Sequence, residues 1–341
     1  MIKYVMDLSA VTPLNRMQIE HLVHLAGRFS SRILFEHKNR TINGKSMLGL
    51  LSMGVTGNLP VTLMVDGEDE EIAAQEIKRL LDNGVAPPKE ASDAEELMQR
   101  IKSRYAELLQ GNLVGIYLHG SLAAGCFHWE RSDIDFLVVV ESPLPVEKKI
   151  ALIETLYALK DEAPPEGFEM SVVTAAACQE SVYPMPYELH YSSRWMRDYE
   201  RDPRGFCERM HGEDPDLTAH VLALHAYGEV LLGPGIIRVF ASPKREDVLC
   251  ALRYDWENAG EHLHENPVYY VLNLCRALAY SREGLVLSKK DGGEWALKKL
   301  SKDYQGVIQA ALNAYNTARD MFYDREKAED FCYDSVEELS Q

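Results

Sequence analysis

The sequence of 341 residues contains no long apolar run and no ordered cysteine pattern. Without 18 or more consecutive apolar residues it offers no candidate membrane span, and the N-terminal stretch MIKYVMDLSA lacks the basic and apolar segments of a secretory signal. The six cysteines are scattered without CxxC spacing, so neither a zinc site nor a disulfide framework is indicated. We therefore expect a cytoplasmic protein without a membrane partner.

Basic residues are also scarce, with 36 Lys+Arg against 53 Asp+Glu and a net charge of -17. Residues 1–90 are nearly balanced, at 10 basic against 11 acidic residues, whereas the remaining 251 residues hold 26 against 42. An acidic body repels nucleic acid, so we expect no nucleic-acid partner. The same charge attracts cations, although acidic surfaces are also common for solubility alone.

The length favours two or three domains, and the patterning predicts an α/β multidomain protein. Residues 1–86 read as a compact α+β domain, with short strands at 1–6, 32–38 and 59–67 and helices at 15–29 and 69–84. Two prolines and small polar residues then interrupt the pattern, so we expect a linker at 87–93.

Residues 94–214 read as a second, α/β domain, and residues 215–338 as an all-α helical domain. A helix is expected to begin with Ser92 as its N-cap, followed by strands at 113–119, 134–141 and 168–175. Beyond about residue 215 strand signals stop, and long helical patterns cover residues 216–233, 245–264, 268–284 and 304–331.

The stretch HGSLAAGCFHWERSDIDFLVVV, residues 119–140, holds the main candidate site. Gly120 and Ser121 follow a strand, and Asp133 and Asp135 begin the next one. Side chains at i and i+2 of a strand share a face, so the two carboxylates point the same way. Carboxylates so close repel each other unless a cation lies between them, and Mg²⁺ suits one or two carboxylates together with phosphate oxygens. Gly120 lets a phosphate approach the backbone, and Ser121 can donate to it.

A third carboxylate, Glu169, precedes the apolar strand of GFEMSVVT. We expect it to act as a general base or as a third metal ligand beside the Asp pair. An isolated Asp-x-Asp pair is usually solvated surface. The order of strand, Gly-Ser, an 11-residue gap, Asp-x-Asp and a strongly apolar strand is far more specific, because motif and structural context agree.

These residues resemble the nucleotidyltransferase superfamily and, within it, the streptomycin/spectinomycin adenylyltransferases. The resemblance rests on LHGS, SDIDFLVVV, FEMSVV, LLGP, VLNLCRALAYSREG and LSKKDGGEWALKKLSKDYQGVIQAAL, over residues of about 100 to 320. It implies a helical domain packed on the nucleotidyltransferase domain, with ATP and drug between them. It also implies AMP transfer from Mg²⁺-ATP to a hydroxyl of a cationic aminoglycoside-type antibiotic, with pyrophosphate leaving.

The resemblance assigns roles by position. It implies Ser121 and Ser132 on the nucleotide, Asp133 and Asp135 on Mg²⁺, and Glu169 as the base. Arg276 and Lys289 would reach the phosphates from the helical domain; each is otherwise an ordinary surface cation. The implied drug-site residues are Trp195, Trp256, Glu261 and Glu265. The last three align only with a one-residue shift, and both tryptophans are also plausible core residues.

Residues 1 to about 84 resemble the phosphocarrier protein HPr of the sugar phosphotransferase system, through NGKSMLGLLSMGV and LPVTLMVDGEDEEIAAQEIKRLL. The resemblance implies an open-faced α+β sandwich. It places Ser46 at the family's regulatory phosphoserine. Where the family carries its phosphorylated His and, two residues later, an Arg, this chain has Asn15 and Met17, so phosphorelay should be lost.

The N-terminal domain then reads as a docking or regulatory module for a protein partner, with phosphate on Ser46 adding charge at a helix start. His21, His24 and His37 are nearby in the sequence; His21 and His24 fall within the first helix and are better explained as ordinary histidines than as a relocated phosphosite. By resemblance the docking surface comprises Met47, Leu48, Leu50 and Leu51, for which core packing is the competing explanation.

Two alternatives to antibiotic adenylylation stay open at this point. One is nucleotidyl transfer to another acceptor, such as a metabolite or a protein hydroxyl. The other is a nucleotide sensor linked to sugar phosphotransferase signalling, against which the presence of all three carboxylates, Asp133, Asp135 and Glu169, argues.

Overall fold

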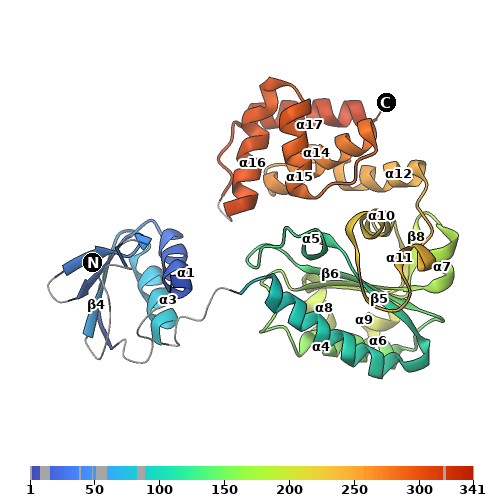
Figure 1. Cartoon of the computed structure of the whole chain (residues 1–341), viewed down its shortest axis with the longest axis horizontal. Coiled ribbons are helices and arrows are strands. Elements are labelled where there is room, and N and C mark those ends of the chain that lie inside the picture. The colour runs from blue at the N-terminus through green and yellow to red at the C-terminus, as the bar shows by residue number, and fades with distance from the viewer. Residues whose placement is uncertain are drawn as a thin grey trace. The chain divides into compact units, whose positions relative to one another are not determined.

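The computed structural model describes residues 2–7, 16–37, 40–47, 49–50, 60–82, 89–257, 259–317 and 320–340. They form two compact units, Met1–Lys89 and Glu90–Gln341 (Figure 1). Among the described residues, no helix combines the length and apolar character needed to cross a bilayer.

The N-terminal unit is a four-stranded antiparallel sheet in the order β1-β4-β2-β3, with two helices packed on it. Its elements are β1 (Ile2–Asp7), α1 (Arg16–Gly27), β2 (Arg32–His37), β3 (Arg40–Asn43), β4 (Pro60–Asp66) and α3 (Glu70–Asp82). Alternate residues of β2 and β4, such as Ile33 and Leu63, are fully buried against Leu22 of α1 and Ile77 of α3. The period-two alternation of strands thus supplies the core face of this sheet.

The second unit is built on a five-stranded sheet in the order β11-β5-β6-β7-β9, in which β6 and β7 run parallel and the other pairs antiparallel. Its strands are β5 (Leu113–Leu118), β6 (Ile134–Val140), β7 (Phe168–Thr174), β9 (Leu189–Ser192) and β11 (Glu229–Leu232). Two short strands, β8 (Met185–Tyr187) and β10 (Gly212–Asp214), pair beside it. The strand β11 corrects the expectation that strands stop near residue 215: after Gly228 the chain returns to the sheet edge and pairs with β5.

Helices cover both faces of this sheet (Figure 1). Phe136 and Val138 of β6 face one layer, and Leu137 and Val139 face the other. The first layer comprises α4 (Ala91–Leu109), α6 (Val146–Tyr157), α8 (Met196–Arg201) and α9 (Pro203–Arg209). The second comprises α7 (Ala175–Glu180), α10 (Leu217–Tyr227) and α11 (Ile236–Val239). Because both faces are covered, β6 reads as the continuous apolar run FLVVV.

The helix α4 begins two residues earlier than the sequence suggests. Its N-cap is Glu90 rather than Ser92, and the Glu90 backbone N–H donates to Asp93 Oδ2 at 2.7 Å. The carboxylate three residues into the helix thus satisfies one of the free N–H groups at the helix start.

The last part of the second unit is a bundle around its own apolar core, which includes Leu272, Trp295 and Phe331. Its helices are α12 (Arg245–Trp256), α13 (Ala259–His262), α14 (Pro267–Glu283), α15 (Lys289–Lys299), α16 (Gln305–Thr317) and α17 (Arg325–Leu339). The single helical pattern expected at 304–331 is therefore two helices.

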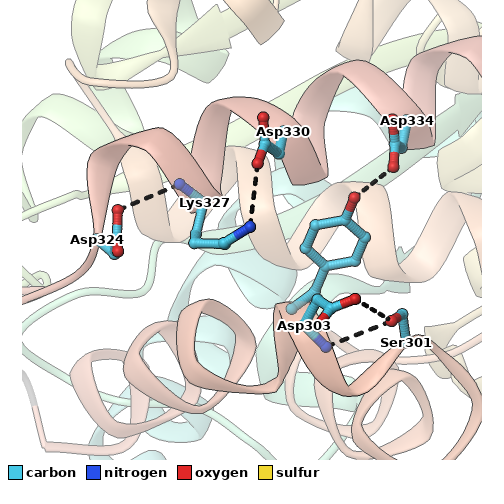
Figure 2. A network of polar contacts seen from close by, with 7 residues as sticks. Ser301, Asp303, Asp324, Lys327, Asp330 and Asp334 are labelled. Carbon is cyan, nitrogen blue, oxygen red and sulfur yellow. Dashed lines mark hydrogen bonds and ion pairs between the residues drawn. The ribbon is translucent and has the colours of Figure 1, made fainter.

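Polar contacts explain where the second of these helices begins. Asp324 caps α17 by accepting from the Lys327 N–H at 3.2 Å, and Lys327 Nζ pairs with Asp330 Oδ2 at 3.3 Å (Figure 2). The Tyr304 hydroxyl donates to Asp334, which ties the preceding turn to α17. A capping carboxylate starts a helix because it satisfies N–H groups that have no intrahelical partner.

Candidate active site

The parallel register of β6 and β7 brings the three candidate carboxylates together. Asp135 lies directly opposite Glu169, and Asp133 is two residues before Asp135 on the same face. A carboxylate oxygen from each of the three lies within 4.8 Å of the other two, close enough to bind one metal ion. The motif on β6 and the separate Glu at the start of β7 therefore form one site at the same end of two neighbouring strands.

The charges at this site are poorly balanced without a cation. Burial, and then repulsion from Asp133 and Glu169, raise the pKa of Asp135 well above its usual value. Burial also raises the pKa of Glu169, partly offset by the charge of His220. Hard oxygen donors held this close fit Mg²⁺, which would relieve their repulsion.

The turn after β5 lies against these carboxylates. Gly120 opens the short helix α5 (Gly120–Ala123) with a φ of +66°, and a Cβ at this position would clash with Oδ2 of Asp135. The preceding residue, His119, donates its backbone N–H to the Asp135 carbonyl at 3.0 Å. A glycine is therefore required here for two reasons, the positive φ and the close approach of Asp135.

Two serines border the turn. Ser121 Oγ is buried and has no hydrogen-bond partner among the described residues, as expected of a group that awaits a ligand. Ser132 is buried, and its Oγ accepts from the His128 N–H at 3.1 Å. Its hydroxyl hydrogen is not used in that bond and can still be donated.

Two further residues of the site were not singled out from the sequence: Asp216, at the start of α10, and His220, one turn later. His220 Nε2 lies 3.1 Å from Asp216 Oδ2 and 3.9 Å from Glu169 Oε1. Their spacing of four places both on one side of a helix. That spacing gave no functional signal, because only the packing of α10 on the Asp135 and Glu169 face of the sheet brings them to the carboxylates.

The carboxylates keep His220 charged. Burial opposes the charged form, but the charge of Asp216, its hydrogen bond and the charge of Glu169 raise the pKa of His220 to about 10. Burial likewise opposes charge on Asp216, yet His220 lowers the pKa of Asp216 to about 2. Glu169, Asp216 and His220 also lie close enough to bind a metal, but a metal would first have to displace the imidazole proton. The all-carboxylate group fits Mg²⁺ better.

The helical bundle of α12 to α17, called the helical part below, brings two cations toward the site. Arg276 on α14 donates from Nε to the Leu287 carbonyl at 2.9 Å and from Nη1 to Asn273 Oδ1 at 3.1 Å. Its charge helps to lower the pKa of Asp216. Lys289, the first residue of α15, lies 4.8 Å from the centre of the Tyr269 ring, and its charge acts on Asp135. Both cations are thus placed where they act on the carboxylate site.

The four expected substrate residues occupy different environments. Trp195 is 42% exposed, and the charge of its neighbour Arg194 acts on Glu169. Trp256 is 4% exposed and packs in the core of the helical part, so in this structure its ring has almost no surface to offer a substrate. Glu261 and Glu265 are exposed at and after α13, where Glu265 pairs with His262 at 3.0 Å.

In the N-terminal unit, Ser46 starts a short helical segment. Its Oγ accepts from the Gly49 N–H at 3.1 Å, and its carbonyl accepts from the Leu50 N–H at 3.0 Å. Leu50 is 3% exposed and belongs to the core, which corrects its place in the expected docking surface, whereas Met47 is partly buried.

Several residues expected to matter in this unit lie outside the described residues or are described only in part. Asn15, Leu48 and Leu51 lie outside the described residues, as do the side chains of Met17, His21 and His24. His37 is buried, at the end of β2.

Comparison with known families matches three segments of the chain. Residues 97–166 match the nucleotidyltransferase domain, and residues 238–338 match the C-terminal domain of aminoglycoside adenylyltransferases. Residues 17–83 match the PTS HPr component phosphorylation site family. These matches confirm the resemblances proposed from the sequence motifs.

Individual relatives agree with the family matches. Aminoglycoside (3'') (9) adenylyltransferases of Klebsiella pneumoniae and Escherichia coli are each 27% identical, over 241 and 222 residues. These alignments cover 66% and 61% of this chain, and 87% and 79% of the two relatives. Spectinomycin adenyltransferase AAD(9) from Enterococcus faecialis, solved with ATP and spectinomycin, has a TM-score of 0.62 at 19% identity. That similarity covers 72% of this chain and 99% of the other, and it shows a shared fold.

Proposed function

Because this chain belongs to the aminoglycoside adenylyltransferase family and is a nucleotidyltransferase enzyme, we propose that it transfers AMP from Mg²⁺-ATP to a hydroxyl of a streptomycin- or spectinomycin-like antibiotic. The observation that carries this proposal is the pairing of Asp135 with Glu169, with Asp133 beside them. Two residues that hold the metal and one that accepts a proton are the minimum that such a transfer needs.

In the proposed reaction, the acceptor hydroxyl oxygen forms a bond to the α-phosphorus of ATP, and the bond from that phosphorus to the pyrophosphate oxygen breaks. The Glu169 carboxylate takes the hydroxyl proton. Asp133 and Asp135 would hold Mg²⁺, which supplies charge neutralisation and alignment of the reacting oxygens.

The nucleotide would be held from both parts of the second unit. The unpartnered Ser121 hydroxyl and the hydrogen of Ser132 are available for phosphate oxygens beside Gly120. Arg276 and Lys289 supply positive charge from the helical part. This charge would attract the negatively charged triphosphate. The Arg276 guanidinium is fixed by two hydrogen bonds, so little side-chain freedom is lost when it binds a phosphate.

Acidic groups next to the base suit a cationic acceptor. The side chains of Glu169 and Asp216 are 27% and 35% exposed, so part of each is open to a bound molecule. Carboxylates attract the amine or guanidinium groups of aminoglycosides, and a partly buried site strengthens that attraction. Trp195 offers an exposed apolar face for the rings of the drug.

Pyrophosphate release from Mg²⁺-ATP tests this function. The purified protein is assayed with streptomycin, spectinomycin and a panel of other aminoglycosides, with Glu169→Gln as the blank. We expect one drug or more to stimulate release, and the variant to lose at least about 10²-fold in rate. ATP binding without stimulation by any drug would contradict the antibiotic acceptor and direct the search to metabolite or protein hydroxyls.

For the N-terminal unit we infer a docking or regulatory role without phosphorelay. The support is the family match of residues 17–83 together with Asn15 and Met17 at the positions expected to hold the phosphorylated His and its Arg. Phosphate on Ser46 would add about two negative charges where Ser46 Oγ now accepts from the Gly49 N–H. Mass spectrometry of the protein from its native host tests this modification, and persistent absence of phosphate on Ser46 would exclude it.

A further inference from the structure

The His220 imidazole lies between two carboxylates that belong to different elements. Its Nε2 is 3.1 Å from Oδ2 of Asp216 and 3.9 Å from Oε1 of Glu169. Asp216 is the N-cap residue of α10, the helix that carries His220, whereas Glu169 is on the central sheet. One nitrogen therefore lies between the start of α10 and the side chain of the proposed base.

The ring of His220 is itself held in place. It packs on the ring of His119 with centroids 4.6 Å apart and an interplanar angle of 36°. His119 is 3% exposed, and its backbone N–H donates to Asp135. The side chain of His220 is 19% exposed, and its Nδ1 is buried without a hydrogen-bond partner among the described residues. The imidazole is thus fixed by packing on one side and by Asp216 at Nε2.

The Glu169 carboxylate needs an attractive partner to hold it over the site. It lies among Asp133, Asp135 and Asp216, three carboxylates that repel it. A long acidic side chain in that field gains by turning toward solvent, unless an attractive group holds it over the site. The His220 ring faces it, with Nε2 3.9 Å from Oε1, and the charge of Arg194 also acts on it.

We propose that His220 is a positioning residue: held by Asp216, it keeps the Glu169 carboxylate aimed at the acceptor hydroxyl. This inference rests on the proposed function, because it assigns a partner to the base of that reaction. In this assignment Asp133 and Asp135 hold the metal, and His220 acts on the base rather than on the reacting atoms. Its effect comes from geometry, since displacement of a reacting group by about 1 Å can cost 10²-fold in rate.

The test compares His220→Leu with His220→Gln in the full-length protein. Gln places an N–H donor near the position of Nε2, whereas Leu fills similar space without one. We expect His220→Leu to lower kcat by about 10- to 100-fold and His220→Gln to restore most of that loss. The KM for ATP and the Kd for Mg²⁺-ATP should stay within about twofold of wild type, because His220 is not among the residues assigned to hold the nucleotide or the metal.

A second comparison asks whether His220 acts through Glu169. Glu169→Asp shortens the base by one methylene and moves it away from His220. If His220 acts through the base, adding His220→Leu to Glu169→Asp should cost little further rate. His225→Gln is the matched control on α10. Nε2 of His225 lies 3.3 Å from the Ala241 carbonyl, and this variant should keep the kcat of the wild type.

The outcomes separate this inference from the proposed function. Full activity of His220→Leu, or equal loss with Leu and Gln, overturns the positioning role alone. The positioning role is also overturned if the kcat losses of Glu169→Asp and His220→Leu multiply in the double variant. A wild-type protein that binds Mg²⁺-ATP but adenylylates no acceptor overturns the proposed function, and with it the base that His220 would serve. If His220→Leu does not fold, His220→Asn, whose amide stops short of Glu169, provides the same comparison.

Discussion

Asp135 of β6 and Glu169 of β7 are direct partners in a parallel strand pair. Because side chains alternate faces along a strand, a shift of one residue in this register would turn Glu169 to the opposite face. The apolar runs that follow both residues are buried on both sides, which holds the register. The site geometry is therefore a consequence of how the core of the sheet packs.

The first prediction concerns Gly120, compared with Gly125. Both have positive φ, +66° and +67°, but only a Cβ at Gly120 would clash with Asp135; nothing lies within 4 Å at Gly125. Under the proposed function, Gly120→Ala should displace Asp135 and lower Mg²⁺-dependent turnover by at least about 10²-fold. Gly125→Ala should cost only backbone strain, about 1 kcal/mol, with little change in turnover.

Measuring turnover against Mg²⁺ concentration for both variants, together with their thermal unfolding, checks this prediction. Equal activity of the two variants would show that the approach of Gly120 to Asp135 is unimportant.

The second prediction separates packing from substrate contact at the two tryptophans. Trp256→Ala should lower the free energy of unfolding by about 3–5 kcal/mol, because the ring is 4% exposed in the helical core. Trp195→Ala, at a 42% exposed side chain, should change it by less than about 1 kcal/mol.

If the proposed function holds, Trp195→Ala should instead raise the KM for the drug and leave the KM for ATP near wild type. Denaturant unfolding and drug-dependent kinetics distinguish the two effects. A Trp256→Ala variant of normal stability would contradict the core assignment.

The third prediction concerns pH and the N-terminal unit. Asp69 accepts from the N–H groups of Ser30 and Ser31 at 2.7 and 2.8 Å and from both hydroxyls. These bonds, with the Ser31 hydroxyl the strongest, hold the pKa of Asp69 well below its usual value. A depressed carboxyl pKa contributes stability that is present above the unfolded pKa, near 3.9, and lost as pH falls through the folded pKa.

Asp69→Asn should therefore weaken this unit at pH 7 and differ less and less from wild type as the pH drops below about 4. Hydrogen exchange of amides in β4 and α3 of the full-length protein measures the difference. Glu71→Gln, an exposed neighbour in α3, is the control and should not change exchange at either pH.

The fourth prediction compares two arginines of α14. Arg276→Lys keeps the charge but cannot make both hydrogen bonds, to the Leu287 carbonyl and to Asn273 Oδ1. Under the proposed function it should raise the KM for ATP by about tenfold, the equivalent of about 1.4 kcal/mol. Steady-state kinetics at varied ATP checks this value.

Arg282→Lys is the matched control, because Arg282 pairs with Glu338 at the surface, with both bonds at 2.6 Å. It should leave the KM for ATP unchanged and cost less than about 1 kcal/mol of stability. If Arg282→Lys raised the KM for ATP as much as Arg276→Lys, the change would come from the helix rather than from Arg276 itself.

Much of the site was predictable from the sequence because local periodicity carries it. The i, i+2 spacing sets Asp133 and Asp135 on one face, and Gly120 and Ser121 mark the turn beside them. The element order likewise predicted the α+β N-terminal unit and the α/β sheet that follows. These features depend on neighbours in the chain, which a sequence displays directly.

The tertiary structure alone decided the contacts between elements that are distant in the sequence. No local pattern distinguishes a helical Asp-x-x-x-His from ordinary surface, so Asp216 and His220 joined the site only when α10 packed on the face that carries Glu169. Strand β11 was hidden in a helical pattern, because its role depends on pairing with β5. Trp256 reads equally well as a binding or a core residue until its exposure is known. The sequence by itself determined which side chains share a face, and long-range packing alone determined which faces meet.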